Sequence, residues 1–163
     1  MKQQVYQNLI QFILDNQSRF YRMAYSYTRH REDALDVVQS AVCKALEAHG
    51  SIKNEDAVKT WFYRILMNEC LTVLKKRKRV ILTADTPEPK EMYYEKGYEQ
   101  GGDIEKELEK LNPDVQGIIK LRFFEEMSLK EISSITGFHL NTVKTKLYRG
   151  LKQLKENVKE ADL

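Results

Sequence analysis

Apolar residues recur at helical spacing in both halves of this chain, and the clearest case lies between Asp33 and Gly50. Apolar side chains fall at positions 34, 37, 38, 41, 42, 45 and 46, which is a stripe of period 3.6. The spacing predicts an amphipathic helix that buries this stripe and ends at Gly50. Its outward polar face would carry Asp33, Asp36, Gln39, Ser40, Cys43, Lys44 and Glu47.

Two further stretches of the first half are helical in character. Residues 5–29 predict one or two helices, and their bulky core would be Phe20, Tyr21, Met23, Ala24, Tyr25 and Tyr27. Residues 60–79, TWFYRILMNECLTVLKKRKR, predict a two-sided helix. One side carries Phe62, Ile65, Leu66, Cys70 and Val73, and the other carries Arg64, Asn68 and Lys75. We expect Phe62 in the core, whereas spacing alone leaves Trp61 and Tyr63 undecided.

The second half contains explicit signals for helix ends. The pair Asn112-Pro113 predicts an N-cap and a first helical residue, and the helix would run to about Glu126. Ser128 followed by Glu131 is the pattern of a capping box. Gly137 is placed to stop the short helix that this box opens.

A final helix would follow a brief turn. Asn141 or Thr142 can cap it, and its buried residues would be Val143, Leu147, Leu151 and Leu154. Two short helices separated by a glycine-containing turn, with the second one basic, predict a helix-turn-helix.

Residues 83–103 interrupt these helical patterns. They contain two of the three prolines and three of the seven glycines, they carry a net charge of −4, and they lack any apolar period. We therefore predict an all-α protein of two small helical domains, residues 1–82 and 104–163, joined by a flexible acidic linker. The C-terminal domain would contain the helix-turn-helix.

The distribution of charge marks where the chain would meet a polyanion. The net charge is only +3, yet residues 1–80 carry 14 basic and 8 acidic residues. Residues 141–155 carry five bases and no acid, and five consecutive bases occupy positions 75–79. Such segregation favours contact with nucleic acid, and a solvated charged surface is the alternative.

Composition and motifs argue against several other classes of protein. With 42% hydrophobic and 31% charged residues, the chain is neither disordered nor membrane-embedded in character, and MKQQVYQNLI lacks the apolar run of a signal peptide. Cys43 and Cys70 are far apart, so we expect buried, inert thiols in a reducing cytoplasm. The histidines are scattered and no nucleotide-binding or hydrolase motif occurs. We expect no metal, cofactor, catalytic residue or small-molecule substrate.

The exposed residues of the final helix are of types that read duplex DNA. Arginine and lysine can donate to guanine O6 and N7, threonine offers a hydroxyl and a methyl group, and a helix N-terminus can bind phosphate. These residues are Thr142, Lys144, Thr145, Lys146, Tyr148 and Arg149. The helix predicted over 60–79 instead suits single-stranded DNA, because bases can stack on aromatic faces while phosphates meet the basic end. Core aromatics and a solvated helix end are the alternatives there.

Three segments in series resemble one family. FYRMAYSYTRHREDALDVVQSAVCKALEAH resembles the polymerase-binding segment of extracytoplasmic-function (ECF) sigma factors of bacterial RNA polymerase, with its DAxDxxQ core. TWFYRILMNECLTVLKKRKR resembles the −10 element segment, and LKEISSITGFHLNTVKTKLYRGLKQL resembles the helix-turn-helix that reads the −35 element. The match covers nearly the whole chain in the family's order. NTVKTKLYRGLK and RFFEEMSLKEI are most similar to the lysozyme-responsive sigma V subgroup.

The resemblance implies an alternative sigma factor that binds core RNA polymerase, recognises the −35 and −10 promoter elements and starts transcription of a stress regulon. It implies polymerase contacts at Asp33, Asp36 and Gln39. The single-stranded −10 element would meet Ile52, Lys53, Asn54, Trp61, Arg64, Asn68, Lys75, Lys76, Arg77 and Lys78, and the final helix would read the duplex −35 element. The family also implies an anti-sigma factor, often membrane-anchored, that would hold the chain at the inner face of the membrane.

Three residues depart from the family pattern. Thr72 stands where an aspartate is common, Asn141 where a glycine is usual, and Gly150 where an alanine is usual. A glycine within a helix costs about 1 kcal/mol relative to alanine. At Gly150 it would allow another helix to approach closely.

Other functions stay open on the residues alone. The helix-turn-helix would suffice for a stand-alone transcriptional regulator, in which residues 20–79 form a ligand-binding or dimerisation domain. Such a regulator would bind duplex DNA tightly without polymerase. An adaptor that only docks polymerase is disfavoured by the basic run and the recognition helix.

Overall fold

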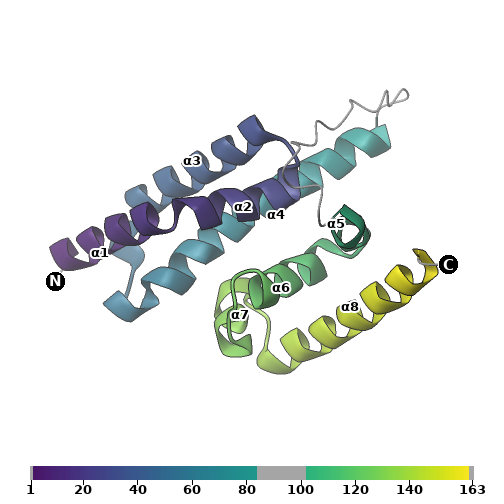
Figure 1. The fold of residues 1–163 in the computed structure, drawn as a ribbon. Coiled ribbons are helices and arrows are strands. Elements are labelled where there is room, and N and C mark those ends of the chain that lie inside the picture. Colours follow the sequence, from purple (N-terminus) through teal and green to yellow (C-terminus); the bar gives the residue numbers. More distant parts are fainter. Residues whose placement is uncertain (1, 84–101, 162–163) are drawn as a thin grey trace. The chain divides into compact units, whose positions relative to one another are not determined.

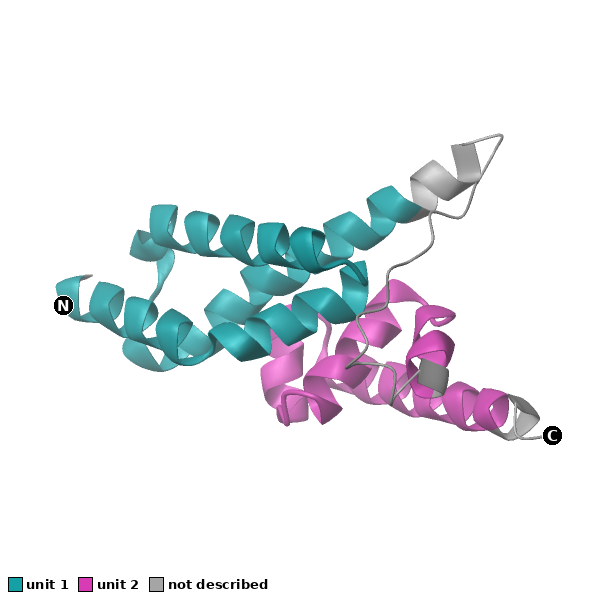
Figure 2. Cartoon of the chain, turned by 45° about the horizontal axis from the view of Figure 1, so that its top comes forward, with its two compact units in different colours: residues 1–93 teal, residues 94–163 magenta. Residues whose placement is uncertain are grey.

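The computed structural model describes residues 2–83 and 102–161, which belong to two compact units, residues 1–93 and 94–163 (Figure 2). Both described ranges are helical, and neither contains a strand. This confirms the predicted all-α fold of two helical domains. Residues 84–101 of the predicted linker lie outside the described residues. The helix predicted over residues 60–79 reaches Thr83, the first residue of the predicted linker. Gly102 and Asp103, at the other end of that linker, belong to a helix that the pattern does not predict.

Unit 1 is a bundle of α1 (Lys2–Asp15), α2 (Gln17–Thr28), α3 (Arg31–Glu47) and α4 (Val58–Thr83) within residues 2–83 (Figure 1). Two 3-10 turns, η1 (His49–Ser51) and η2 (Glu55–Ala57), lead from α3 to α4. Helices α2, α3 and α4 pack against one another, and α1 packs against α4. The helices predicted within residues 5–29 are therefore two.

Aromatic rings from three helices fill the centre of unit 1. The ring centroids of Phe20 and Phe62 lie 4.5 Å apart, and Phe12 lies 6.0 Å from Phe62. Tyr63 adds a ring 5.5 Å from that of Phe20. Such pairs contribute about 0.5–1.5 kcal/mol each beyond the burial of their surface. The core position of Phe62 is confirmed, and Tyr63 belongs to the core as well.

The amphipathic character of α3 is confirmed, whereas its predicted end is wrong. The apolar stripe is buried or half-buried, and every residue of the predicted outward face is exposed. However, α3 ends at Glu47, and the N–H of Ala48 bonds to the Lys44 carbonyl. Gly50 lies inside η1 without a positive φ, because the chain tightens into a 3-10 turn instead of leaving through a left-handed residue. We expect both thiols to be buried, but only Cys70 is, because Cys43 is exposed on the outward face of α3.

Unit 2 consists, within residues 102–161, of α5 (Gly102–Glu109), α6 (Pro113–Phe123), α7 (Leu129–Thr136) and α8 (Leu140–Ala161). Helix α8 packs against α5, α6 and α7 (Figure 1). The apolar pattern predicts no helix before Asn112, so α5 is a feature that only the structure reveals. Helices α7 and α8 form the predicted helix-turn-helix.

The predicted N-cap of α6 and both predicted ends of α7 are confirmed in atomic detail, whereas α6 ends at Phe123 and not near Glu126 as predicted. The side chain of Asn112 accepts the Asp114 N–H at 3.1 Å. The Ser128 hydroxyl accepts the Glu131 N–H at 3.1 Å, and the Glu131 carboxylate accepts the Ser128 N–H at 3.1 Å. Gly137 adopts φ 82° at the end of α7, a conformation that glycine tolerates best. These contacts satisfy backbone groups that the helices leave unpaired.

The predicted cap of the last helix is wrong. Helix α8 begins at Leu140, and the Val143 N–H bonds to the His139 carbonyl. Asn141 and Thr142 therefore lie in the first turn rather than at the cap. The turn after α7 is short, since the Ser133 hydroxyl bonds to the Phe138 carbonyl at 2.5 Å and draws the chain directly into α8.

Gly150 lies where α8 packs closely against α6. A methyl group added at Gly150 would overlap Val115 Cγ1 and would meet Ile119 Cδ1 at 3.1 Å. Valine is stiff, so the overlap could not be relieved by a simple rotation. The predicted close approach of another helix at Gly150 is thus confirmed.

Candidate nucleic-acid interface

Helix α4 separates two faces along its length. Its buried face includes Val58, Phe62, Leu66 and Cys70. Its outer face carries Arg64, Asn68 and Lys75, and all three are exposed, as the spacing predicts. Trp61, Arg64, Asn68, Thr72 and Lys75 follow one another at steps of three or four, and such positions share one side of a helix. We call these five residues the outer stripe of α4.

Trp61 is the aromatic residue of the segment TWFY that reaches the surface. Its side chain is half-buried, while Phe62 and Tyr63 are buried. The aromatic start of α4 therefore supplies two rings to the core and one to the outer stripe. Thr72, the departure from the family pattern, lies on the same stripe, and its hydroxyl donates to the Asn68 carbonyl at 2.7 Å.

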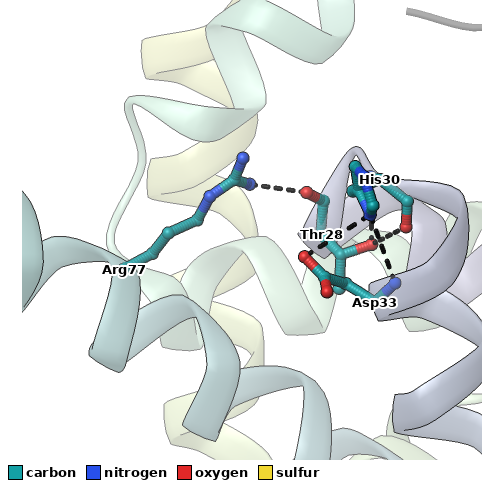
Figure 3. A network of polar contacts seen from close by, with 4 residues as sticks. All are labelled: Thr28, His30, Asp33 and Arg77. Carbon is teal, nitrogen blue, oxygen red and sulfur yellow. Dashed lines mark hydrogen bonds and ion pairs between the residues drawn. The ribbon is translucent and has the colours of Figure 1, made fainter. Parts of the chain in front are cut away.

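The basic end of α4 is less uniform than its sequence indicates. Lys75 and Lys76 are exposed. Arg77 is half-buried, and its Nη1 donates to the backbone carbonyl of Thr28 at 2.7 Å (Figure 3). Arg77 thus makes a contact inside unit 1 that its place in the basic run does not predict, and its contact with DNA stays a prediction. The side chain of Lys78 lies outside the described residues.

The loop before α4 also contains both buried and exposed residues among those predicted to contact DNA. Ile52 has a relative exposure of 8%, so its side chain is buried in unit 1, and its contact with the −10 element stays a prediction. Lys53 and Asn54 are both exposed. Two of the three predicted loop residues therefore remain accessible to DNA.

The outer face of α3 presents the predicted polymerase-binding residues. Asp33, Asp36 and Gln39 are all exposed. Leu35, beside them, has a relative exposure of 44%, which the apolar stripe did not single out because position 35 lies off it. Lys44 forms an ion pair with Glu69 and so links α3 to α4. The surface thus combines carboxylates and an amide with one apolar side chain.

Helix α8 presents most of its predicted DNA-reading residues to solvent. Lys144, Thr145, Tyr148 and Arg149 are exposed. Thr142 and Lys146 are half-buried, and Lys146 Nζ lies 5.0 Å from the centre of the Phe138 ring. Burial of Val143 and Leu147 on the opposite side fixes which face of α8 points outward; these two, with half-buried Leu151 and Leu154, are the predicted apolar residues.

The described residues offer little to other kinds of chemistry. No group of three or more histidine, cysteine, aspartate or glutamate side chains in these ranges is arranged to hold a metal ion. None of the helices described is both long and apolar enough to cross a membrane.

Comparison with known protein families accounts for both units. The model of sigma-70 region 2 matches residues 12–80, and the model of sigma-70 region 4 matches residues 102–154. The chain belongs to the sigma-70 family. Region 2 covers α2, α3 and most of α4, and region 4 covers the helix-turn-helix. A stand-alone regulator is therefore disfavoured, because its ligand-binding domain would have to occupy the place of region 2.

Individual sigma factors match along nearly the full length. RNA polymerase sigma factor SigV of Bacillus subtilis is 38% identical over 159 residues, which cover 95% of this chain and 93% of SigV. Sigma factor YlaC of the same organism is 29% identical and covers 90% and 91%. The sigma factor RpoE of Bartonella quintana, solved with the anti-sigma factor NepR, has a TM-score of 0.71 at 25% identity and covers 91% and 95%.

These matches confirm the resemblance to ECF sigma factors and to the sigma V subgroup. The chain is an alternative sigma factor, which binds core RNA polymerase and recognises promoter DNA. The outer faces of α3, α4 and α8 are the candidate surfaces for these partners.

Proposed function

We propose that this sigma factor docks on core RNA polymerase through the outer face of α3. Asp33, Asp36 and Gln39 lie there within two turns, and the exposed side chain of Leu35 adds an apolar contact. Carboxylates would repel phosphates, so this surface suits a protein better than DNA. The resemblance to the family points to the clamp helices of the largest polymerase subunit as the partner.

Helix α4 and the loop before it would capture the −10 element as a single strand. The observation that carries this proposal is the outer stripe of α4, where Trp61 offers a ring and Asn68 an amide before the lysines begin. An unstacked base can recover about 1–3 kcal/mol on an aromatic platform. The amide can bond to exposed base edges while lysines hold the phosphates. The other residues assigned to this surface are Lys53, Asn54, Arg64, Lys75 and Lys76.

Helix α8 would read the −35 element as a duplex. Its N-terminal part presents Lys144, Thr145, Tyr148 and Arg149 on the side opposite the buried residues. A helix-turn-helix places the first turns of its second helix in the major groove. Arg149 and Lys144 can donate to guanine there, whereas Thr145 is held close to its own helix by a bond to the Asn141 carbonyl at 2.9 Å.

An anti-sigma factor would restrain this chain until a stress signal releases it, and the released chain would start a stress regulon. Support comes from RpoE of Bartonella quintana, which resembles this chain in fold and was solved with the anti-sigma factor NepR. A membrane-anchored partner would hold the chain at the inner face of the membrane. Fractionation of cells that express the chain with and without a candidate partner tests this, and an unchanged distribution would contradict it.

Transcription in vitro tests the function as a whole. The chain and core polymerase together should initiate at a matching promoter, and neither should do so alone. Asp36→Arg should abolish co-purification with core polymerase without changing the circular dichroism spectrum. Gln7→Arg, on the exposed side of α1, introduces the same side chain and should bind normally. Tight, specific binding of the chain to duplex promoter DNA without polymerase would instead favour a stand-alone regulator.

A further inference from the structure

Arg77 occupies a position of the buried face of α4 although it belongs to the basic run. The buried face continues from Phe62 through Leu66, Cys70 and Val73 at steps of four, four and three. One further step of four reaches Arg77, and its half-buried side chain agrees with that register. Lys75 and Lys76 lie off this register and are exposed.

One partner of Arg77 lies at the end of another helix. Thr28 is the last residue of α2, and its carbonyl is one of those that a helix end leaves without an intrahelical partner. Arg77 Nη1 donates to that carbonyl at 2.7 Å, and Thr28 has a relative exposure of only 1%. A cation at the C-terminal end of a helix is favoured by the helix dipole, and a short bond from a charged donor is stronger than a neutral one.

The same corner leads directly into α3. The Thr28 hydroxyl donates to the His30 carbonyl at 3.1 Å, and His30 Nδ1 accepts the Asp33 N–H at 3.4 Å as the N-cap of α3 (Figure 3). Arg29, between them, adopts φ 56°, a left-handed conformation that non-glycine residues keep only when their surroundings hold it. Arg77 therefore contacts the backbone just before α3 begins, and α3 carries the residues proposed to face polymerase.

We propose that Arg77 is a positioning residue, which couples the polymerase-facing side of α3 to the DNA-facing outer stripe of α4, and that it is not a phosphate contact. The inference rests on the function proposed above. Polymerase binding needs only the surface of α3, and strand capture needs only the stripe of α4. Promoter opening needs both surfaces held at a fixed separation at the same time. Loss of Arg77 leaves each surface intact and loosens the link between them.

The test compares Arg77→Gln with Lys76→Gln in the complete holoenzyme. Each substitution removes one positive charge, and the two positions are adjacent. Lys76→Gln should lower the slope of log affinity against log salt concentration by about 0.7–0.9 for one lost phosphate contact. Arg77→Gln should leave this slope and the affinity for core polymerase near those of the parent. It should slow promoter opening by roughly tenfold, as expected from the loss of one bond from a charged donor.

Two further readouts separate positioning from general stability and from charge. Amide hydrogen exchange at residues 29–34 should become faster in Arg77→Gln and stay unchanged in Lys76→Gln. Arg77→Lys keeps the charge but loses the planar fork of donors, so it should restore opening only in part. A phosphate contact would instead be restored nearly in full by lysine.

Three results would overturn the inference. The first is a flattened salt dependence in Arg77→Gln equal to that of Lys76→Gln. The second is a parallel loss of polymerase affinity and opening, which would mark a residue that only stabilises the fold. The third is opening at the parent rate. If the parent holoenzyme itself fails to open a matching promoter, the proposed function falls and this inference falls with it.

Discussion

Helices α4 and α8 are both proposed to contact DNA, but their basic residues are arranged differently. In α4 five of the bases are consecutive, at positions 75–79, and successive residues of a helix point about 100° apart, so such a run spreads around the helix. Lys75 and Lys76 reach solvent, whereas Arg77 turns toward Thr28. In α8 the bases are spaced, and none of those whose side chains the structure describes occupies the buried stripe that contains Val143 and Leu147. Spacing, more than the number of bases in a row, thus decides which of them can share a face.

The two helices also differ in what stands beside the bases. The outer stripe of α4 places Trp61 and Asn68 before the lysines, a combination suited to unstacked bases. The outer face of α8 places Tyr148 and Arg149 near the start of a 22-residue helix, where a duplex groove would meet it. The comparison supports the proposal that α4 captures a single strand and that α8 reads a duplex.

The largest effect is expected from Asn68→Ala or Trp61→Ala, which should block strand separation. Each removes a contact worth about 1–3 kcal/mol to an exposed base, and opening should slow by roughly ten- to 100-fold. Polymerase binding and closed-complex formation should persist, because the face of α3 is unchanged. Permanganate reactivity of the −10 region measures this. If Asn68→Ala opens duplex promoters as well as the parent does, α4 does not carry melting.

Substitutions in α8 should show that this helix acts on the −35 element and not on the −10 element. Arg149→Ala or Lys144→Ala should weaken −35 recognition by about 1–3 kcal/mol if the side chain contacts a base. Lys152→Ala, further along the same helix and also exposed, is the matched control. It should weaken binding evenly across promoter sequences and reduce the salt dependence. Transcription from promoter variants distinguishes these outcomes, and equal losses at every variant from Arg149→Ala would assign it to the phosphate backbone.

The packing that holds α8 in place can be tested at Gly150. Gly150→Ala should destabilise unit 2 by about 1–2 kcal/mol, because the strain of overpacking against Val115 exceeds the gain of about 1 kcal/mol in helix propensity. Gly50→Ala is the control, since nothing lies within 4 Å of a methyl group there. Urea unfolding measures both. Val115→Ala added to Gly150→Ala should recover part of the loss, and a stabilising Gly150→Ala would contradict the close contact.

The smallest effect is expected from the cap of α7, the helix that supports α8. Ser128→Ala removes the hydroxyl that accepts the Glu131 N–H and should cost about 1 kcal/mol of stability. Ser134→Ala, exposed on the same helix, should be neutral or slightly stabilising because alanine favours the helix. Thermal unfolding of the two variants decides, and equal midpoints would mean that the capping box contributes nothing measurable.

How much of this could be predicted from sequence depended on whether the signal was local. The capping box at Ser128 and the glycine stop at Gly137 are complete within a few residues, and both were predicted correctly. Gly50 is also a glycine near a helix end, but unlike Gly137 it does not adopt a positive φ. The 3-10 turn that follows α3 is set by packing rather than by the glycine. The start of α8 was missed since the Ser133 contact that shortens the turn spans five residues.

The sequence predicts which helix faces of the candidate site are exposed better than it predicts the contacts that individual side chains make. Periodicity correctly predicts that Arg64, Asn68 and Lys75 are exposed on α4. Periodicity alone would also have predicted that Arg77 is partly buried, since position 77 continues the apolar register, but arginine is not expected in a buried position. The contact that accounts for it joins residues 49 positions apart and so leaves no local trace. Exposed Leu35 was missed for a different reason, because position 35 lies off the apolar stripe and an apolar residue is not expected on the polar face.

Promoter opening on two templates tests the division of labour between α4 and α8 most directly. One template is fully duplex, and the other has an unpaired −10 region and the same duplex −35 element. On the duplex, both Asn68→Ala and Arg149→Ala should impair initiation. On the unpaired template, Asn68→Ala should recover most of its activity because the cost of melting is removed, while Arg149→Ala should stay impaired. Equal defects of Asn68→Ala on both templates, or recovery of Arg149→Ala on the second, would contradict the account.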